Sequence, residues 1–91
     1  MSKKPTKDQQ ERYDRVLDGG CIICQMPAEI HHMRSGAGLG QRGKGLLPLC
    51  PKHHRTGNYG EAIHAGQKGF EYKFGSEDYL LDRLKERMNE A

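Results

Sequence analysis

The sequence has no tryptophan, few aromatic residues, only three cysteines and no long apolar run. Hydrophobic residues make up 34% of its 91 positions, so one small domain with a limited core is expected. A chain of this size usually needs a cross-link, such as disulfides or a metal ion. The odd cysteine count and the lack of an apolar signal segment argue against a secreted disulfide framework or a membrane protein. We therefore expect an intracellular protein with thiolates on a metal.

Acidic residues are absent from Ile30 to Gly60, although the whole chain has 12 of them and a net charge of +3. A central stretch that carries only positive charge suits a polyanion such as a nucleic-acid backbone. A solvated basic loop would have the same composition, so charge alone does not decide between the two.

The sequence predicts a short disordered basic arm over residues 1–7, followed by a single domain over residues 8–91. Thr6 and Gln9 have the spacing of a capping box, which predicts a helix that ends at Gly19-Gly20. A first short strand is expected over residues 28–33.

The C-terminal half begins with a glycine-rich loop and a second short strand over residues 46–49. A helix is expected to begin at Pro51, and another over residues 67–74. Ser76 is a good N-cap for a last amphipathic helix, to which we assign no chemistry. The sequence therefore predicts a small α+β fold.

Two residue pairs have the spacing of metal ligands, Cys21-Ile-Ile-Cys24 and Cys50-Pro-Lys-His53. A gap of two residues lets both side chains reach one ion, and two such pairs complete a tetrahedron around zinc. The alternative is a Cys21–Cys24 redox pair with Cys50 buried as a small apolar residue. Because the zinc reading uses every cysteine, we predict one structural zinc site.

All five histidines lie between His31 and His64, and the zinc site uses one of them. The zinc would bring His31, His32 and His54 together, because each is within about ten residues of a zinc ligand. Imidazoles bind divalent metals, and one can act as a general base. Neighbours on a regular strand face opposite sides, so His31 and His32 share a site only at a strand end or a bulge.

Two segments, Ala28–Met33 and Leu47–Gly57, together resemble an HNH (His-Me finger) nuclease. The segment Tyr59–Gly66 is similar to the phage recombination enhancement function (Ref) family of HNH nucleases, described as RecA-dependent. The resemblance covers Cys21 to about Leu81. It implies a zinc-stapled ββα-metal (His-Me finger) core with flanking helices, and an endonuclease that hydrolyses DNA phosphodiester bonds in recombination.

The same resemblance implies roles for individual residues. His32 matches the general base, and His31, His54 and His64 match ligands of a catalytic Mg, Mn or Zn ion, with Asn58 as the alternative last ligand. Four basic side chains would contact DNA phosphates with little sequence specificity. They are Arg34, Arg42, Lys44 and Arg55. The implied partners are DNA and a RecA filament, in a bacterial cytoplasm that would be the host's if the protein is phage-encoded.

Two other function classes compete with the nuclease. A non-catalytic zinc module that binds DNA or a recombination protein would not need four further histidines. A redox or metal-buffering protein would be expected to have more cysteines than this chain.

Overall fold

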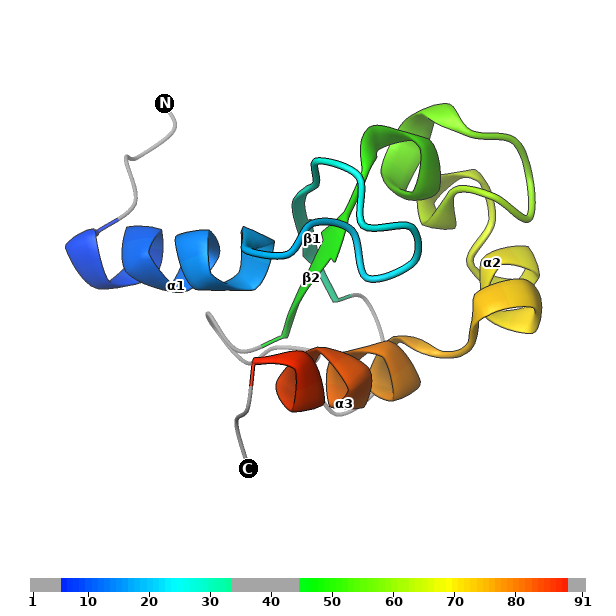
Figure 1. The fold of residues 1–91 in the computed structure, drawn as a ribbon. Helices are drawn as coiled ribbons and strands as arrows, with labels where there is room; N and C mark the ends of the chain where they lie inside the picture. Colours follow the sequence, from blue (N-terminus) through cyan, green and yellow to red (C-terminus); the bar gives the residue numbers. More distant parts are fainter. Residues whose placement is uncertain (1–5, 34–44, 89–91) are drawn as a thin grey trace.

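A hairpin of two short strands lies at the centre of the protein (Figure 1). The computed structural model describes residues 6–33 and 45–88. β1 (Glu29–His32) pairs antiparallel with β2 (Leu46–Leu49), and His31 lies opposite Leu47. The small α+β fold expected from the sequence is therefore confirmed. Most of the predicted arm and most of the glycine-rich loop fall outside the described residues.

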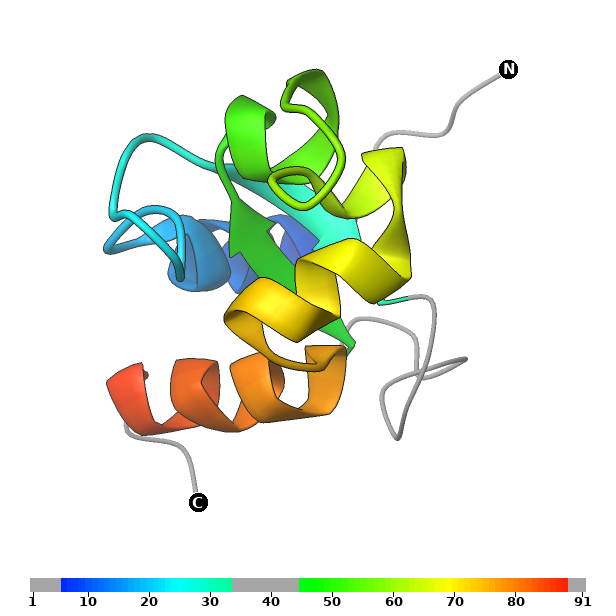
Figure 2. The same cartoon turned by 90° about the vertical axis from the view of Figure 1, so that its right-hand side faces the viewer.

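Helices cover both sides of the hairpin. α1 (Lys7–Leu17) packs on both strands, and Figure 2 shows it behind the hairpin, with α2 (Gln67–Phe74) in front. Between β2 and α2 lie two single-turn elements, the π-helix η2 (Lys52–Thr56) and the 3-10 helix η3 (Ile63–Ala65). The last helix, α3 (Glu77–Arg87), packs against β2. No helix within residues 6–33 and 45–88 is long and apolar enough to cross a membrane.

Both predicted helix caps are present. The Gln9 backbone N–H donates to Thr6 Oγ1 at 3.1 Å, and the Thr6 N–H donates to Gln9 Oε1 at 3.0 Å. Ser76 Oγ accepts from the backbone N–H of Tyr79 at 3.1 Å and begins α3. These side chains satisfy amide groups that have no partner within their helices, so they fix where α1 and α3 start.

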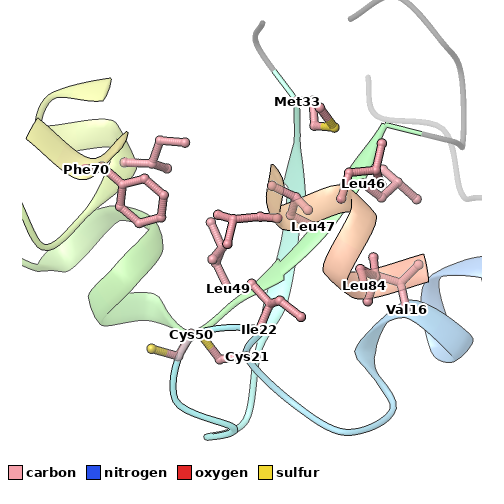
Figure 3. Close-up of a cluster of buried hydrophobic side chains, with 13 residues drawn as sticks. Val16, Cys21, Ile22, Met33, Leu46, Leu47, Leu49, Cys50, Phe70 and Leu84 are labelled. Carbon is pink, nitrogen blue, oxygen red and sulfur yellow. The ribbon is translucent and has the colours of Figure 1, made fainter. Parts of the chain in front are cut away.

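The hydrophobic core lies on both sides of β2, whose four residues are all buried. Figure 3 shows Phe70 on one side of this strand and Val16 and Leu84 on the other. Pro48 has no N–H to donate, but its carbonyl accepts from the Ile22 N–H at 2.9 Å. The segment after α1 is thereby held against β2.

We expect Phe70→Ala to lower the free energy of unfolding by about 3–5 kcal/mol, because the Phe70 side chain is fully buried. Urea denaturation of the metal-loaded protein would measure the change. Tyr72→Ala is the matched control, since Tyr72 is on the same helix but 96% exposed, and its cost should stay within about 0.5 kcal/mol. Equal costs for the two variants would contradict this description of the core.

Candidate metal centres

Three cysteines and one histidine converge at one end of the hairpin. Cys21 and Cys24 lie in the turns between α1 and β1, Cys50 directly follows β2, and His53 is in η2. Cys50 Sγ is 3.2 Å from His53 Nδ1 and 3.6 Å from Cys24 Sγ, and Cys21 Sγ is 3.8 Å from His53 Nδ1. In a tetrahedral zinc site, bond lengths place two sulfurs about 3.8 Å apart and sulfur and nitrogen about 3.5 Å apart. The four side chains therefore have the arrangement of zinc ligands.

The thiols of this cluster are not disulfide-bonded. A disulfide requires two sulfurs at about 2.05 Å, far shorter than the separation of Cys24 and Cys50. The backbone N–H of Ile23 donates to Cys21 Sγ at 3.4 Å, a contact that stabilises a thiolate. The structure thus brings together the four side chains predicted as zinc ligands, and they could hold a metal ion such as zinc.

Three histidines form a second cluster, with one from β1, one from η2 and one from η3. Their potential ligand atoms all lie within 4.8 Å of one another. His54 Nε2 and His64 Nε2 are 3.0 Å apart, and the His31 ring centroid is 5.1 Å from that of His54 and 5.5 Å from that of His64. Two nitrogens on one tetrahedral ion would be about 3.3 Å apart. His31, His54 and His64 therefore have the geometry to hold a second metal ion.

A carboxylate lies behind two of these three imidazoles. His31 Nε2 is 2.6 Å from Glu77 Oε2, and His54 Nδ1 is 2.6 Å from Glu29 Oε2. Each contact occupies one ring nitrogen and leaves the lone pair of the other for a metal. Metal-bound histidines usually have this arrangement, because the carboxylate fixes the tautomer and the orientation of the ring.

The surroundings of His31 favour its neutral form, which is the form that binds a metal. Burial lowers the pKa of His31, although its hydrogen bond with Glu77 acts in the opposite direction. The Glu77 side chain is itself fully buried, and its second oxygen accepts from Gln67 Nε2 at 3.1 Å. The hydrogen bonds from His31 and Gln67 offset the cost of removing this carboxylate from water.

The last helix, to which no chemistry was assigned, contacts the histidine cluster. Glu77, in the first turn of α3, contacts His31 across 46 residues of sequence. From the sequence, an acid in this position is fully explained as a partner of the helix dipole. Glu29 was also missed, although it lies on β1 two residues before His31, where strand alternation places both on one face.

The structure does not bring His32 to the other histidines. β1 pairs regularly through His32, so its side chain points away from that of His31. His32 is exposed, and its ring lies edge-to-face with Tyr13 at 6.4 Å. His32 is the last residue of β1, but it pairs regularly with Leu46, so this strand end does not turn its side chain toward the cluster.

Of the remaining predicted site residues, two lie in the described part of the chain and three do not. Arg55 donates to both oxygens of Glu29, at 2.8 and 3.2 Å, and this contact is the largest cause of the lowered pKa of Glu29. The Asn58 carbonyl accepts from the backbone N–H groups of Glu61 and Ala62 at 2.8 and 3.1 Å. Three predicted DNA contacts lie outside the described residues. They are Arg34, Arg42 and Lys44.

Comparison with known proteins gives the family. The model of the family described as "recombination enhancement, RecA-dependent nuclease" matches residues 5–89. The chain belongs to this family. It is also 36% identical over 84 residues to the uncharacterized protein YdfU of Escherichia coli (strain K12), a match that covers 86% of this chain and 22% of YdfU. The chain thus spans about a fifth of that relative's length, and the family resemblance inferred from the sequence is confirmed.

We expect Glu77→Ala to reduce the free energy of unfolding by about 1–3 kcal/mol, because it leaves buried His31 without this carboxylate. Urea denaturation followed by circular dichroism would measure it. Glu86→Ala, an exposed position on the same helix, should change stability by less than about 0.5 kcal/mol. A Glu77→Ala variant as stable as Glu86→Ala would show that the His31–Glu77 contact contributes nothing.

Proposed function

We propose that this protein is an HNH endonuclease that hydrolyses DNA phosphodiester bonds in a metal-dependent reaction. The observation that carries the proposal is the cluster of His31, His54 and His64, with glutamates behind two of the rings. Membership of a family described as a RecA-dependent nuclease supports it. The order β1, β2, η2 agrees with a ββα-metal core, in which two strands and the following helix surround the ion.

In this proposal the two clusters have different roles. The site of Cys21, Cys24, Cys50 and His53 holds a structural zinc, because four protein ligands leave no open position for a substrate. The three histidines supply fewer ligands than most ions take, so part of the coordination sphere is left for the substrate. His64 is exposed, which puts the open side of this site at the surface.

In the proposed catalytic site, neighbouring side chains orient the metal ligands in the absence of DNA. Glu77 and Glu29 orient the rings of His31 and His54, and burial lowers the pKa of His31, which favours its neutral form. Arg55 is held beside the site by Glu29, so its charge lies where a phosphate would approach. When bound, a divalent Mg, Mn or Zn ion supplies positive charge that stabilises the phosphate and its leaving oxygen during hydrolysis.

We propose that His32 is the general base, although its position limits how it can act. Its imidazole is on the opposite face of β1 from His31, next to Tyr13. A base there can take the proton of the attacking water only if the scissile phosphate reaches from the three histidines around the exposed edge of the hairpin to His32. The proposed substrate is DNA in the bacterial cytoplasm, and the proposed partner is a RecA filament. Four basic side chains would bind the DNA phosphates. They are Arg34, Arg42, Lys44 and Arg55.

The nuclease proposal predicts different failures for two histidine variants. His54→Ala should lose both cleavage and the second metal ion, because its Nε2 lies in the cluster. His32→Ala should keep the metal but lower kcat by about 10²–10⁴-fold, as expected for the loss of a general base. Cleavage of supercoiled and single-stranded DNA with Mg²⁺ or Mn²⁺, with and without a RecA filament, and metal analysis of each variant would measure both effects.

Each outcome of that assay has a definite meaning. Full activity of His32→Ala would remove His32 from the mechanism and leave the metal site intact. No cleavage by the wild type under any condition would reject the enzyme in favour of a zinc module that binds DNA or a recombination protein.

The structural zinc gives a separate prediction. Cys24→Ser should lose one zinc per chain and most of its native circular dichroism, since binding at such sites contributes about 10–16 kcal/mol to folding. His64→Ala, which changes only the histidine cluster, should retain that zinc and the native spectrum. Purified wild-type protein without zinc, yet folded, would refute the assignment.

A further inference from the structure

Tyr59 is an exposed aromatic residue held in place by two glycines. Its side chain is 70% exposed, although its ring lies against the backbone at Gly66 and Gly69. A Cβ at Gly69 would be 2.6 Å from Cε1 of this ring, and one at Gly66 would overlap Cε2 on the other edge. The ring thus touches the two glycines through opposite edges, while most of the side chain stays exposed.

The glycine within α2 has a cost that this contact explains. Glycine in a helix is about 1 kcal/mol less favourable than alanine. Gly69 is inside the eight-residue helix α2, and the three atoms nearest to a Cβ built there all belong to the Tyr59 side chain. Glycine at this position weakens α2, but it allows the exposed Tyr59 ring to lie against the helix in a fixed position.

Lysines accompany this ring in an open groove of about 610 Å³. Its walls include Tyr59 and Tyr72, which is 96% exposed, together with Lys68 and Lys73. Glu61 is the acid of the groove, and its carboxylate is 3.5 Å from Lys52 Nζ and accepts the Asn58 N–H at 3.2 Å. The groove therefore presents two open rings and an excess of positive charge.

The groove is close to the histidine cluster along the chain. Gly66, on which Tyr59 rests, is two residues after His64, the exposed member of that cluster.

We propose that this groove binds a single-stranded segment of DNA, with an unpaired base stacked on Tyr59 and phosphates near Lys68 and Lys73. The inference rests on the proposed function, which makes DNA the substrate. Base faces in a duplex are covered by neighbouring pairs, so only an unpaired base can use the open face of a tyrosine ring. Aromatic rings alternating with cations are the usual means of binding single strands without sequence preference.

The test compares binding of labelled oligothymidylate and of a duplex of equal length, by fluorescence anisotropy without added Mg²⁺ or Mn²⁺. Tyr59→Ala should weaken single-strand binding by about tenfold or more and change duplex binding much less. Tyr59→Phe keeps the ring and should bind like the wild type. Tyr79→Ala is the matched control, because Tyr79 is 52% exposed but lies outside the groove, on α3.

A second variant tests the position of the ring rather than its presence. Gly69→Ala should strengthen α2 but displace Tyr59, so single-strand binding falls while thermal stability does not. In the Tyr59→Ala background, Gly69→Ala should have no further effect on binding, because the contact is already gone.

The outcomes separate this inference from the nuclease proposal. Wild-type-like single-strand binding by Tyr59→Ala would overturn the inference even if the protein cleaves DNA. Loss of binding to a RecA filament in Tyr59→Ala, with oligothymidylate binding unchanged, would also overturn it by assigning the groove to a protein. A wild type that binds single strands through Tyr59 but never cleaves them would support the groove and refute only the nuclease.

Discussion

The register of one short hairpin determines which side chains meet at the histidine cluster of this protein. Because strand side chains alternate between faces, pairing His31 with Leu47 sends Glu29 and His31 to the same side. A slip of one residue would turn His31 and Glu29 to the opposite face and His32 toward the cluster. Two contacts with the segment between α1 and β1 oppose such a slip. The Ile22 N–H donates to the Pro48 carbonyl, and Cys50 meets Cys24 directly after β2.

The two metal clusters are connected through a single turn of helix. His53 and His54 are neighbours in η2, yet His53 faces the cysteines and His54 faces His31 and His64. Consecutive residues of a helix point in different directions, so one short element can serve both sites. Whatever fixes the position of His53 therefore also fixes His54. In this way the position of the cysteine cluster is coupled to that of the histidine cluster.

Buried charge links the histidine cluster to the core. The Glu77 carboxylate is enclosed among the packed side chains of α3 and is tolerated there because His31 and Gln67 supply hydrogen bonds. The same helix contributes Leu80, Leu81 and Leu84 to the hydrophobic core. Folding of α3 onto β2 thus completes the core and orients His31 at once. At the surface, by contrast, the exposed ring of Tyr59 is held by close contact with Gly66 and Gly69 rather than by burial in the core.

The sequence alone determined the features that depend on local spacing. The helix caps at Thr6 and Ser76, the four zinc-ligand candidates and the resemblance to the family all follow from short motifs, whose geometry is set within a few residues. Only the tertiary structure decided which distant groups meet. Glu77 reaches His31 across the hairpin, and His32 turns away from it, because burial and strand register act between segments far apart in the chain. Strand alternation could indicate that His32 and His31 face apart, but no local pattern encodes the contact of Glu77 with His31.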